Sequence, residues 1–313
     1  MSKLICIGDL AYVCSSFLPL SWLHALARMS GRLRHWRSRQ TREVVRENLR
    51  SYFGSSQSEA EIDRMTRLFF EYKELRILLY YLFPGLSPRQ LETIFPMEGL
   101  EHLDHMRSEK KGGILLLSHM NSIIGFIARD ILRSRGYDVR VAYPTETLPF
   151  TPTRFRRFWD RIRPPVNAVG GADFFAQFNV RPIVRRLQEG AIILLTGDGW
   201  HSAGLVKAKF LGRELYFTTG AVGIARAVGC PILPLFVLGY PPDRLRVVIE
   251  KPLPLETTED EQRDLELVVS NYVTRLEAHL VEDPLAWEHW FEERALETMA
   301  KLPEIPLEDR YRV

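Results

Sequence analysis

Short apolar segments alternate with amphipathic ones through most of this 313-residue chain. Five apolar segments have the length of strands and cover residues 114–118, 139–143, 191–196, 231–238 and 245–250. Segments with apolar residues at helical spacing cover 59–84, 88–94, 101–108, 180–189, 219–228 and 258–281, and another stops at Gly136. Strands that alternate with helices are typical of an α/β fold with a mixed, mainly parallel central sheet flanked by helices. We expect that fold, with irregular chain at 144–172 and in the glycine-rich loop that leads to the helix at 219.

The N-terminal segment is apolar without being a clear membrane span. In residues 4–30 the apolar run is interrupted by Asp9, Pro19, His24 and Arg28, so about 20 consecutive apolar residues are not available. Only Lys3 precedes the run, which does not favour a cleaved secretory signal. An interfacial anchor, a short spanning helix and an amphipathic helix packed on the protein's own core all fit this pattern.

Arginine is concentrated directly after this segment. Between residues 28 and 50 there are eight arginines and two glutamates. Basic residues beside an apolar, Trp-containing segment favour anionic headgroups on the cytoplasmic side of a membrane, although such a run is also typical of a solvated helix face. We therefore predict a membrane-associating region at 1–50 and an α/β domain at 51–313. The predicted location is the cytoplasmic face of the inner membrane, peripheral or singly anchored.

Composition excludes several classes of protein. The chain is 46% hydrophobic and 26% charged, as expected for an ordered globular protein, and its net charge of +3 is too small to indicate a nucleic-acid partner. The three cysteines form no metal-ligand spacing, so we expect reduced thiols and no metal site. There is no G-x-S-x-G or H-E-x-x-H motif.

Two polar residues follow predicted strands directly. His119 comes after the strand at 114–118, and Asp198 comes after the strand at 191–196. Ligands of such sheets bind beyond the carboxyl ends of the strands, where a histidine can act as a general base and a carboxylate can orient it. The structural alternatives are a hydrogen-bonded core histidine and an aspartate that caps a turn.

Other candidate binding residues lie near these two. Asn121 and Ser122 follow His119, and the loop GDGWHSAG contains Gly197, Gly199 and Trp200 beside Asp198. Small residues let backbone amides approach a polar ligand, and His201 in the same loop is a reserve candidate for the base. A second basic cluster, RFRRFWDRIR, contains Arg154 and Arg157, which could contact phosphates or an acidic carrier protein.

Several segments, read in order, carry a family resemblance. They are VRENLRSYFG, MEGLEHLDHMRSEKKGGILLLSH, LLTGDGWHSAGLVKAKFLGRELYFTTGAVGIARAVGCPILPLFV and DPLAWEHWFEERAL. Over residues 40–295 the chain resembles the bacterial lipid A biosynthesis acyltransferases of the lysophospholipid acyltransferase superfamily. The resemblance implies a glycerol-3-phosphate acyltransferase-like fold.

The resemblance also implies an enzyme that moves an acyl chain from an acyl carrier protein or acyl-CoA thioester to a hydroxyl or amine. The acceptor would be a lipid or a specialised small molecule. His119 matches the family's catalytic base, and no cofactor beyond the thioester co-substrate is implied. Ile124, however, stands where the family has an acidic residue five positions after the histidine.

Three explanations for Ile124 remain open. Another residue substitutes for the acid, with Asp198 preferred over Asn121 or Ser122; or the acceptor is an amine that needs less base assistance. Otherwise the chain is a catalytically inactive acyl-binding or scaffold relative at the membrane. Asp130 is too far from His119, because eleven residues of helix span about 16 Å. Ile123 and Ile127 either border the acyl groove or pack in the core.

Overall fold

The computed structural model describes residues 19–109, 112–143, 174–175, 179–200, 202–239, 245–255, 258–307 and 310. Its centre is a seven-stranded sheet in the order β1-β9-β8-β2-β5-β3-β4. The strands are β1 Met97–Glu98, β2 Gly113–Leu117, β3 Val139–Tyr143, β4 Phe174–Phe175, β5 Ile192–Thr196, β8 Ile232–Leu238 and β9 Arg246–Ile249. Strands β8, β2, β5, β3 and β4 are parallel, whereas β9 is antiparallel to β8 and pairs in parallel with β1. The expected mixed, mainly parallel sheet is confirmed.

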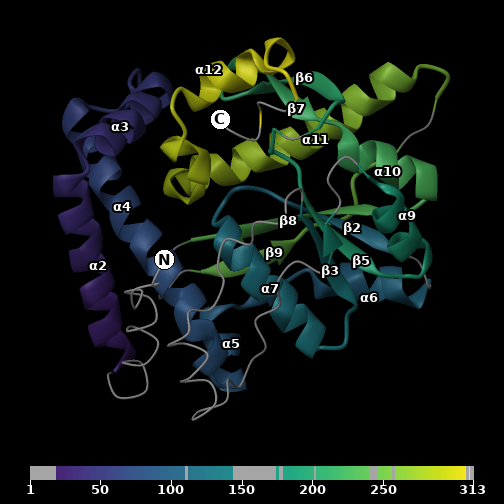
Figure 1. The fold of residues 1–313 in the computed structure, drawn as a ribbon, viewed down its shortest axis with the longest axis horizontal. Coiled ribbons are helices and arrows are strands. Elements are labelled where there is room, and N and C mark those ends of the chain that lie inside the picture. Colours follow the sequence, from purple (N-terminus) through teal and green to yellow (C-terminus); the bar gives the residue numbers. More distant parts are fainter. Residues whose placement is uncertain are drawn as a thin grey trace, which may run out of the picture.

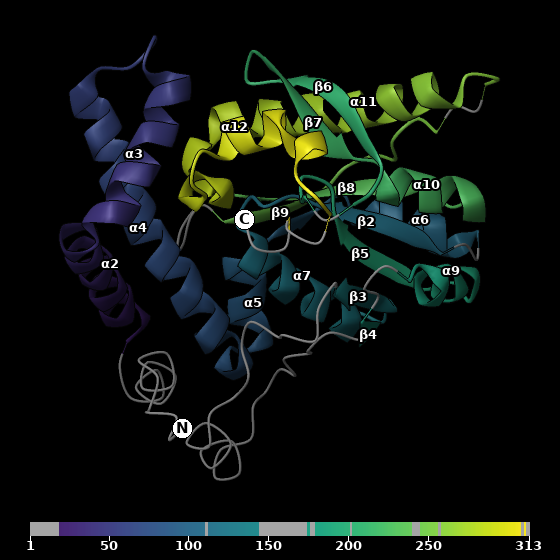
Figure 2. The ribbon, with the colours of Figure 1, turned by 45° about the horizontal axis from the view of Figure 1, so that its top comes forward.

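Helices cover both faces of this sheet (Figures 1 and 2). They are α2 Leu20–Arg37, α3 Arg39–Phe53, α4 Glu59–Leu82, α5 Pro88–Ile94, α6 Leu100–Ser108, α7 Ser122–Ser134, α9 Arg181–Gln188, α10 Gly220–Val228, α11 Glu261–Glu282 and α12 Ala295–Ala300. Short 3-10 turns lie at η1 Phe83–Gly85, η2 Pro284–Ala286, η3 Glu288–Phe291 and η4 Leu302–Glu304. The bounds of α4, α5, α6, α9, α10 and α11 lie within three residues of the expected ones, and Ser58 caps α4 by accepting a hydrogen bond from the Glu61 amide.

Strand β2 forms the centre of the core, because all five of its residues are buried. Its side chains alternate between two hydrophobic clusters: Ile114 and Leu116 pack with α11, whereas Leu115 and Leu117 pack with α7. A strand buried on both faces reads as an uninterrupted apolar run, which is why GILLL was recognisable in the sequence.

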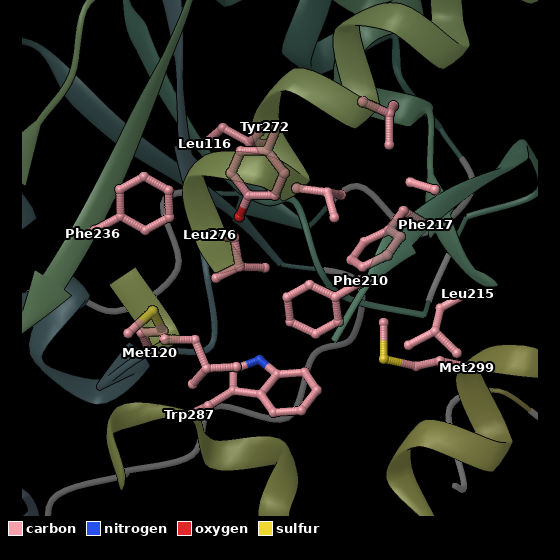
Figure 3. Packing of buried hydrophobic residues seen from close by; sticks show 14 of the residues in the cluster. Leu116, Met120, Phe210, Leu215, Phe217, Phe236, Tyr272, Leu276, Trp287 and Met299 are labelled. Atoms are coloured by element: carbon pink, nitrogen blue, oxygen red, sulfur yellow. The ribbon is translucent and has the colours of Figure 1, made fainter. Parts of the chain in front are cut away.

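The glycine-rich region after Asp198 contains an antiparallel hairpin, β6 Leu205–Phe210 and β7 Arg213–Thr218, that the sequence interpretation treated as loop. The turn residues Leu211 and Gly212 both have positive φ, 53° and 73°, as a two-residue hairpin turn requires. The strands alternate buried and exposed side chains, and the buried Phe210 and Phe217 pack near Trp287 and Met299 (Figure 3). The hairpin was missed in the sequence because the glycine-rich composition outweighed the alternation of apolar and polar residues along its strands.

The N-terminal helices form a separate layer beside the sheet (Figure 1). Helix α2 packs on α4 through Leu23 and Ala27, and a Cβ at Gly31 would lie 2.6 Å from the Cα of Glu71, so only glycine permits this close approach. The opposite face of α2 exposes five large apolar side chains: Trp22, Leu26, Met29, Leu33 and Trp36. Within the described ranges, none of the helices combines the length and apolar character that a membrane span requires.

The expected division at residue 50 falls inside α3, whose Asn48 side chain donates to the backbone oxygens of Trp290 and Glu292. The two-part organisation stays a prediction.

Candidate functional site

His119 and Asp198 occupy equivalent positions just after two neighbouring parallel strands, β2 and β5. Leu117 of β2 pairs with Thr196 of β5, and each functional residue follows two positions later. Both side chains therefore lie beyond the carboxyl edge of the sheet, with Nδ1 of His119 2.8 Å from Oδ1 of Asp198. The structure thus brings together the two residues that the sequence singled out.

Asp198 is completely buried and its carboxylate receives several hydrogen bonds. The backbone amide of His119 donates to Oδ1 and Oδ2 at 3.0 and 2.9 Å, and the indole Nε1 of Trp287 donates to Oδ2 at 3.0 Å. Burial raises the pKa of Asp198, but the charge of His119, its hydrogen bond and the charge of His289 outweigh burial and lower the pKa to about 2. The carboxylate is therefore ionised at neutral pH.

His119 is oriented by this carboxylate and keeps 27% of its side chain exposed. Burial lowers its pKa, whereas the charge of Asp198 and the hydrogen bond to it raise the pKa, and the net result is a raised value. Because an ionised carboxylate only accepts, Nδ1 carries the proton, and in neutral His119 the lone pair is on Nε2. This is the tautomer that a general base requires.

The segment from Pro284 to Glu292, which we call the closing segment, contacts both residues. The backbone oxygen of Ala286 accepts a hydrogen bond from the backbone N–H of Asn121 at 2.8 Å. The backbone N–H of Glu288 donates to the backbone oxygen of His119 at 2.9 Å. The ring Nε2 of His289 lies 3.0 Å from the backbone oxygen of Asp198. The closing segment therefore fixes the backbone on either side of the His119–Asp198 pair.

Asn121 links the site to the rest of the fold. Its backbone has a positive φ of 50° and its side chain is buried. The amide nitrogen donates to the oxygens of Val237 and Gly239, and the amide oxygen accepts from Nη1 of Arg76 at 2.8 Å. Both ends of the Asn121 side chain thus hold neighbouring protein segments.

The remaining predicted site residues are distributed around the pair. Ser122 donates to Oε2 of Glu288 at 2.6 Å. A Cβ at Gly199 would lie 3.7 Å from Cε1 of His119, so this glycine lies beside the catalytic candidate's ring, whereas Gly197 lies under the ring of Tyr272. Trp200 is buried and stacks on His289, which in turn packs 4.3 Å from the His119 ring.

Three expectations lie outside the described residues: Arg154, Arg157 and His201. Their assignment to substrate binding, or to a reserve base in the case of His201, stays a prediction.

A family model described as bacterial lipid A biosynthesis acyltransferase matches residues 4–296. The chain belongs to the bacterial lipid A biosynthesis acyltransferase family. The resemblance inferred from the sequence is confirmed, and the match extends further toward the N-terminus than residue 40. A search of curated proteins gave no match.

In this lipid A acyltransferase family member, Ile124 stands where the family pattern has an acidic residue. Ile124 is fully buried on α7 and packs in the same cluster as Leu115 and Leu117. Of the three residues weighed as substitutes for the missing acid, Asp198 is the one that pairs with the His119 ring in the structure. The carboxylate that contacts the His119 ring therefore follows the neighbouring strand β5, whereas the family pattern has an acidic residue five positions after the histidine.

His119, Asp198 and His289 also have donor atoms that all lie within 4.8 Å of one another. Imidazole and carboxylate are common metal ligands. Here the ring nitrogens Nδ1 of His119 and Nε2 of His289 already face oxygens of Asp198, so an ion would have to replace those contacts.

Sequence reasoning missed Trp287, His289 and Arg76. The first two lie in the Trp-rich segment used for the family resemblance, but nothing in the sequence places that segment against His119. Arg76 is a charged residue within the apolar stretch ELRILLYYL, and it is 2% exposed. A buried arginine in an apolar helix is a signal that could have been read.

Proposed function

We propose that this lipid A acyltransferase family member transfers an acyl chain from an acyl carrier protein or acyl-CoA thioester to a hydroxyl or amine of a lipid or specialised small acceptor. The observation that carries the proposal is the 2.8 Å contact between His119 Nδ1 and the buried, ionised Asp198. It offers His119 a carboxylate partner, whereas the missing acid at position 124 left an inactive acyl-binding relative as one of three open explanations.

In the proposed reaction, Nε2 of His119 accepts the proton of the acceptor as its oxygen or nitrogen attacks the thioester carbonyl carbon. Asp198 stabilises the imidazolium that forms. The tetrahedral intermediate collapses to the ester or amide as the carbon–sulfur bond breaks. The imidazolium then returns its proton to the leaving thiolate, which restores neutral His119 and gives the free thiol.

The experiment measures free thiol release from a panel of carrier-protein and CoA thioesters with lipid and amine acceptors. We expect His119→Ala to abolish turnover and Asp198→Asn to lower it by about 10,000-fold. His105→Ala is the matched control, because His105 is 76% exposed on α6, outside the site. Full activity of His119→Ala would remove His119 as the base, and no turnover of any thioester by the unmodified protein would leave the acyl-binding alternative in place.

We also infer that α2 lies on an anionic membrane surface at the cytoplasmic side. The exposed side chains of Trp22, Leu26, Met29, Leu33 and Trp36, which we call the α2 stripe, are spaced four, three, four and three residues apart and so share one helix face. Arginines flank this face, and tryptophan is favoured at membrane interfaces. An amphipathic helix of this kind binds by its apolar face and by attraction to anionic lipid.

A further inference from the structure

A pocket of about 600 Å³ lies where the three N-terminal helices meet, away from the His119 site. Helix α2 contributes His35, and α3 contributes Arg42, Glu43 and Arg46. Helix α4 contributes the remaining lining residues, which are Ala60, Asp63, Arg64, Thr66 and Arg67. The volume of the pocket falls in the range of small-molecule sites, about 300–1,000 Å³.

Positive charge in this pocket exceeds negative charge. Asp63 pairs with Arg46, Glu43 lies 3.8 Å from Arg42, and the guanidinium of Arg64 is engaged by Glu61. Arg67 is exposed and, within the described residues, pairs with no carboxylate. An arginine that lines a concave surface without an acidic partner is available to an anion.

The positive charge of the pocket also acts on the side chain of His35. It packs edge-on against Phe70, with ring centroids 5.4 Å apart. Burial lowers the pKa of His35, and the charges of Arg42 and Arg67 lower it further, against the weaker opposing effects of Asp63 and Glu71. Binding of an anion among these arginines would reverse that effect.

The pocket adjoins the α2 stripe. His35 lines the pocket, and the next residue, Trp36, ends the stripe with 72% of its surface exposed. Nη1 of Arg42 donates to the backbone oxygens of both, at 2.8 and 3.3 Å, which ties α3 to this end of α2. A ligand with an anionic head and an apolar tail would find partners for both parts at consecutive residues.

We propose that this pocket binds the phosphate of an anionic lipid headgroup while the α2 stripe lies in the membrane interface. The planar guanidinium groups suit the oxygens of a phosphate. The proposal rests on the membrane placement of α2 and not on the acyl-transfer chemistry. Arg76 is the α4 residue that contacts Asn121 beside His119, and Arg67 is separated from it by nine residues of helix, about 14 Å. The lining arginines could also meet an acidic carrier protein, but an apolar Trp36 beside the pocket favours a lipid.

The first experiment follows the imidazole signal of His35 by NMR, assigned with His35→Gln, at constant ionic strength. The probes are sodium phosphate, monomeric dihexanoyl phosphatidylglycerol, dihexanoyl phosphatidylcholine and an acyl carrier protein. We expect phosphatidylglycerol to raise the pKa of His35 toward the ordinary value of about 6.5, at lower concentration than sodium phosphate does, and Arg67→Gln to remove the effect.

Other outcomes overturn the proposal. An unchanged His35 signal with every probe would exclude an anion site. Equal potency of sodium phosphate and phosphatidylglycerol, or of phosphatidylcholine and phosphatidylglycerol, would exclude an anionic lipid as the specific ligand. A response to the carrier protein alone would assign the pocket to a protein partner.

The second experiment measures binding to vesicles of phosphatidylglycerol and phosphatidylcholine. Arg67→Gln should weaken binding about 5-fold, the effect of one basic residue near an anionic surface, and circular dichroism should show both variants folded. Arg263→Gln is the matched control, because Arg263 is exposed on α11 outside the N-terminal layer. Equal losses in both variants would mean nonspecific attraction. Neither experiment measures acyl transfer, so either result is independent of His119.

Discussion

The indole Nε1 of Trp287 lies 3.0 Å from Oδ2 of Asp198, the carboxylate oxygen that does not face the His119 ring nitrogen. The two residues are 89 positions apart in the sequence. With one oxygen held by Trp287 and the other by His119, the carboxylate has little freedom to rotate. Trp287 is therefore a positioning residue in the proposed reaction.

Replacing Trp287 by phenylalanine keeps an aromatic ring and removes the donor. We expect kcat to fall about 10-fold with KM nearly unchanged, because Asp198 loses one of the bonds that fix it. Trp290→Phe is the control: its Nε1 donates to the Pro284 oxygen at 2.6 Å, in the same closing segment but away from Asp198. Both variants should lose about 1–3 kcal/mol of stability. Equal kinetic losses in the two would contradict a specific role for Trp287.

The pH dependence of turnover should carry the signature of the pair. The base must be neutral, and Asp198 raises the pKa of His119, so activity should fall as pH decreases through that raised value. In Asp198→Asn burial dominates and the pKa of His119 drops. The acid limb of the rate profile should then move to lower pH while the maximum rate falls. An unmoved limb would indicate that another group sets it.

The same pair should contribute to stability in acid. The pKa of Asp198 is about 2 in the fold, below the ordinary value of 3.8, so its contribution is complete above about pH 4 and is lost as pH falls toward 2. Denaturant unfolding at a series of pH values should show a shallower acid loss for Asp198→Asn than for the unmodified protein. Parallel curves would argue against ionised Asp198 as a stabilising group.

Placing the family's acidic residue at position 124 should destabilise the protein and should not increase turnover. Ile124 is fully buried among apolar side chains, so Ile124→Asp buries a carboxyl group without a partner and should cost at least about 3 kcal/mol. Ile124→Val, which shortens the side chain without adding charge, should cost about 1 kcal/mol. Thermal melting of the two variants tests this difference, and a stable Ile124→Asp variant with increased turnover would contradict it.

Membrane binding should depend on the α2 stripe. Trp22→Ser with Trp36→Ser should lower affinity for anionic vesicles at least about 10-fold, since each removes a large apolar side chain from the interface. Leu267→Ser on α11 is the control, because Leu267 is 54% exposed but lies outside the stripe. Flotation with vesicles measures the binding. Similar affinity of the double variant and the unmodified protein would remove the interfacial role of α2.

Strand positions were predictable from the sequence to within about one residue at each end where a strand is buried on both faces. Such strands appear as apolar runs, and β2 and β8 have no exposed residue. The hairpin β6–β7 was missed because its period-two pattern lies in a stretch rich in glycine. Its identification needed the turn geometry at Leu211 and Gly212.

The pairing of His119 with Asp198 was accessible from the sequence because parallel strands end at one edge of a sheet. The closing segment was not, since local pattern carries no information on which distant backbone groups bond to Asn121 or Asp198. The hydrogen bonds of Asn121 are a further example: a polar residue beside a catalytic candidate reads as a ligand contact, whereas here it holds β8 and α4.

The proposed base His119 and its carboxylate partner Asp198 follow different strands, β2 and β5, so their alignment depends on the register of the sheet. A one-residue slip of β5 against β2 would displace Asp198 by about 3.3 Å and turn its side chain to the other face. Partial opening of that strand pair in denaturant should therefore abolish the proposed acyl transfer while helices remain intact. In the proposed reaction, catalysis depends on the cooperative pairing of two strands rather than on the integrity of a single helical turn.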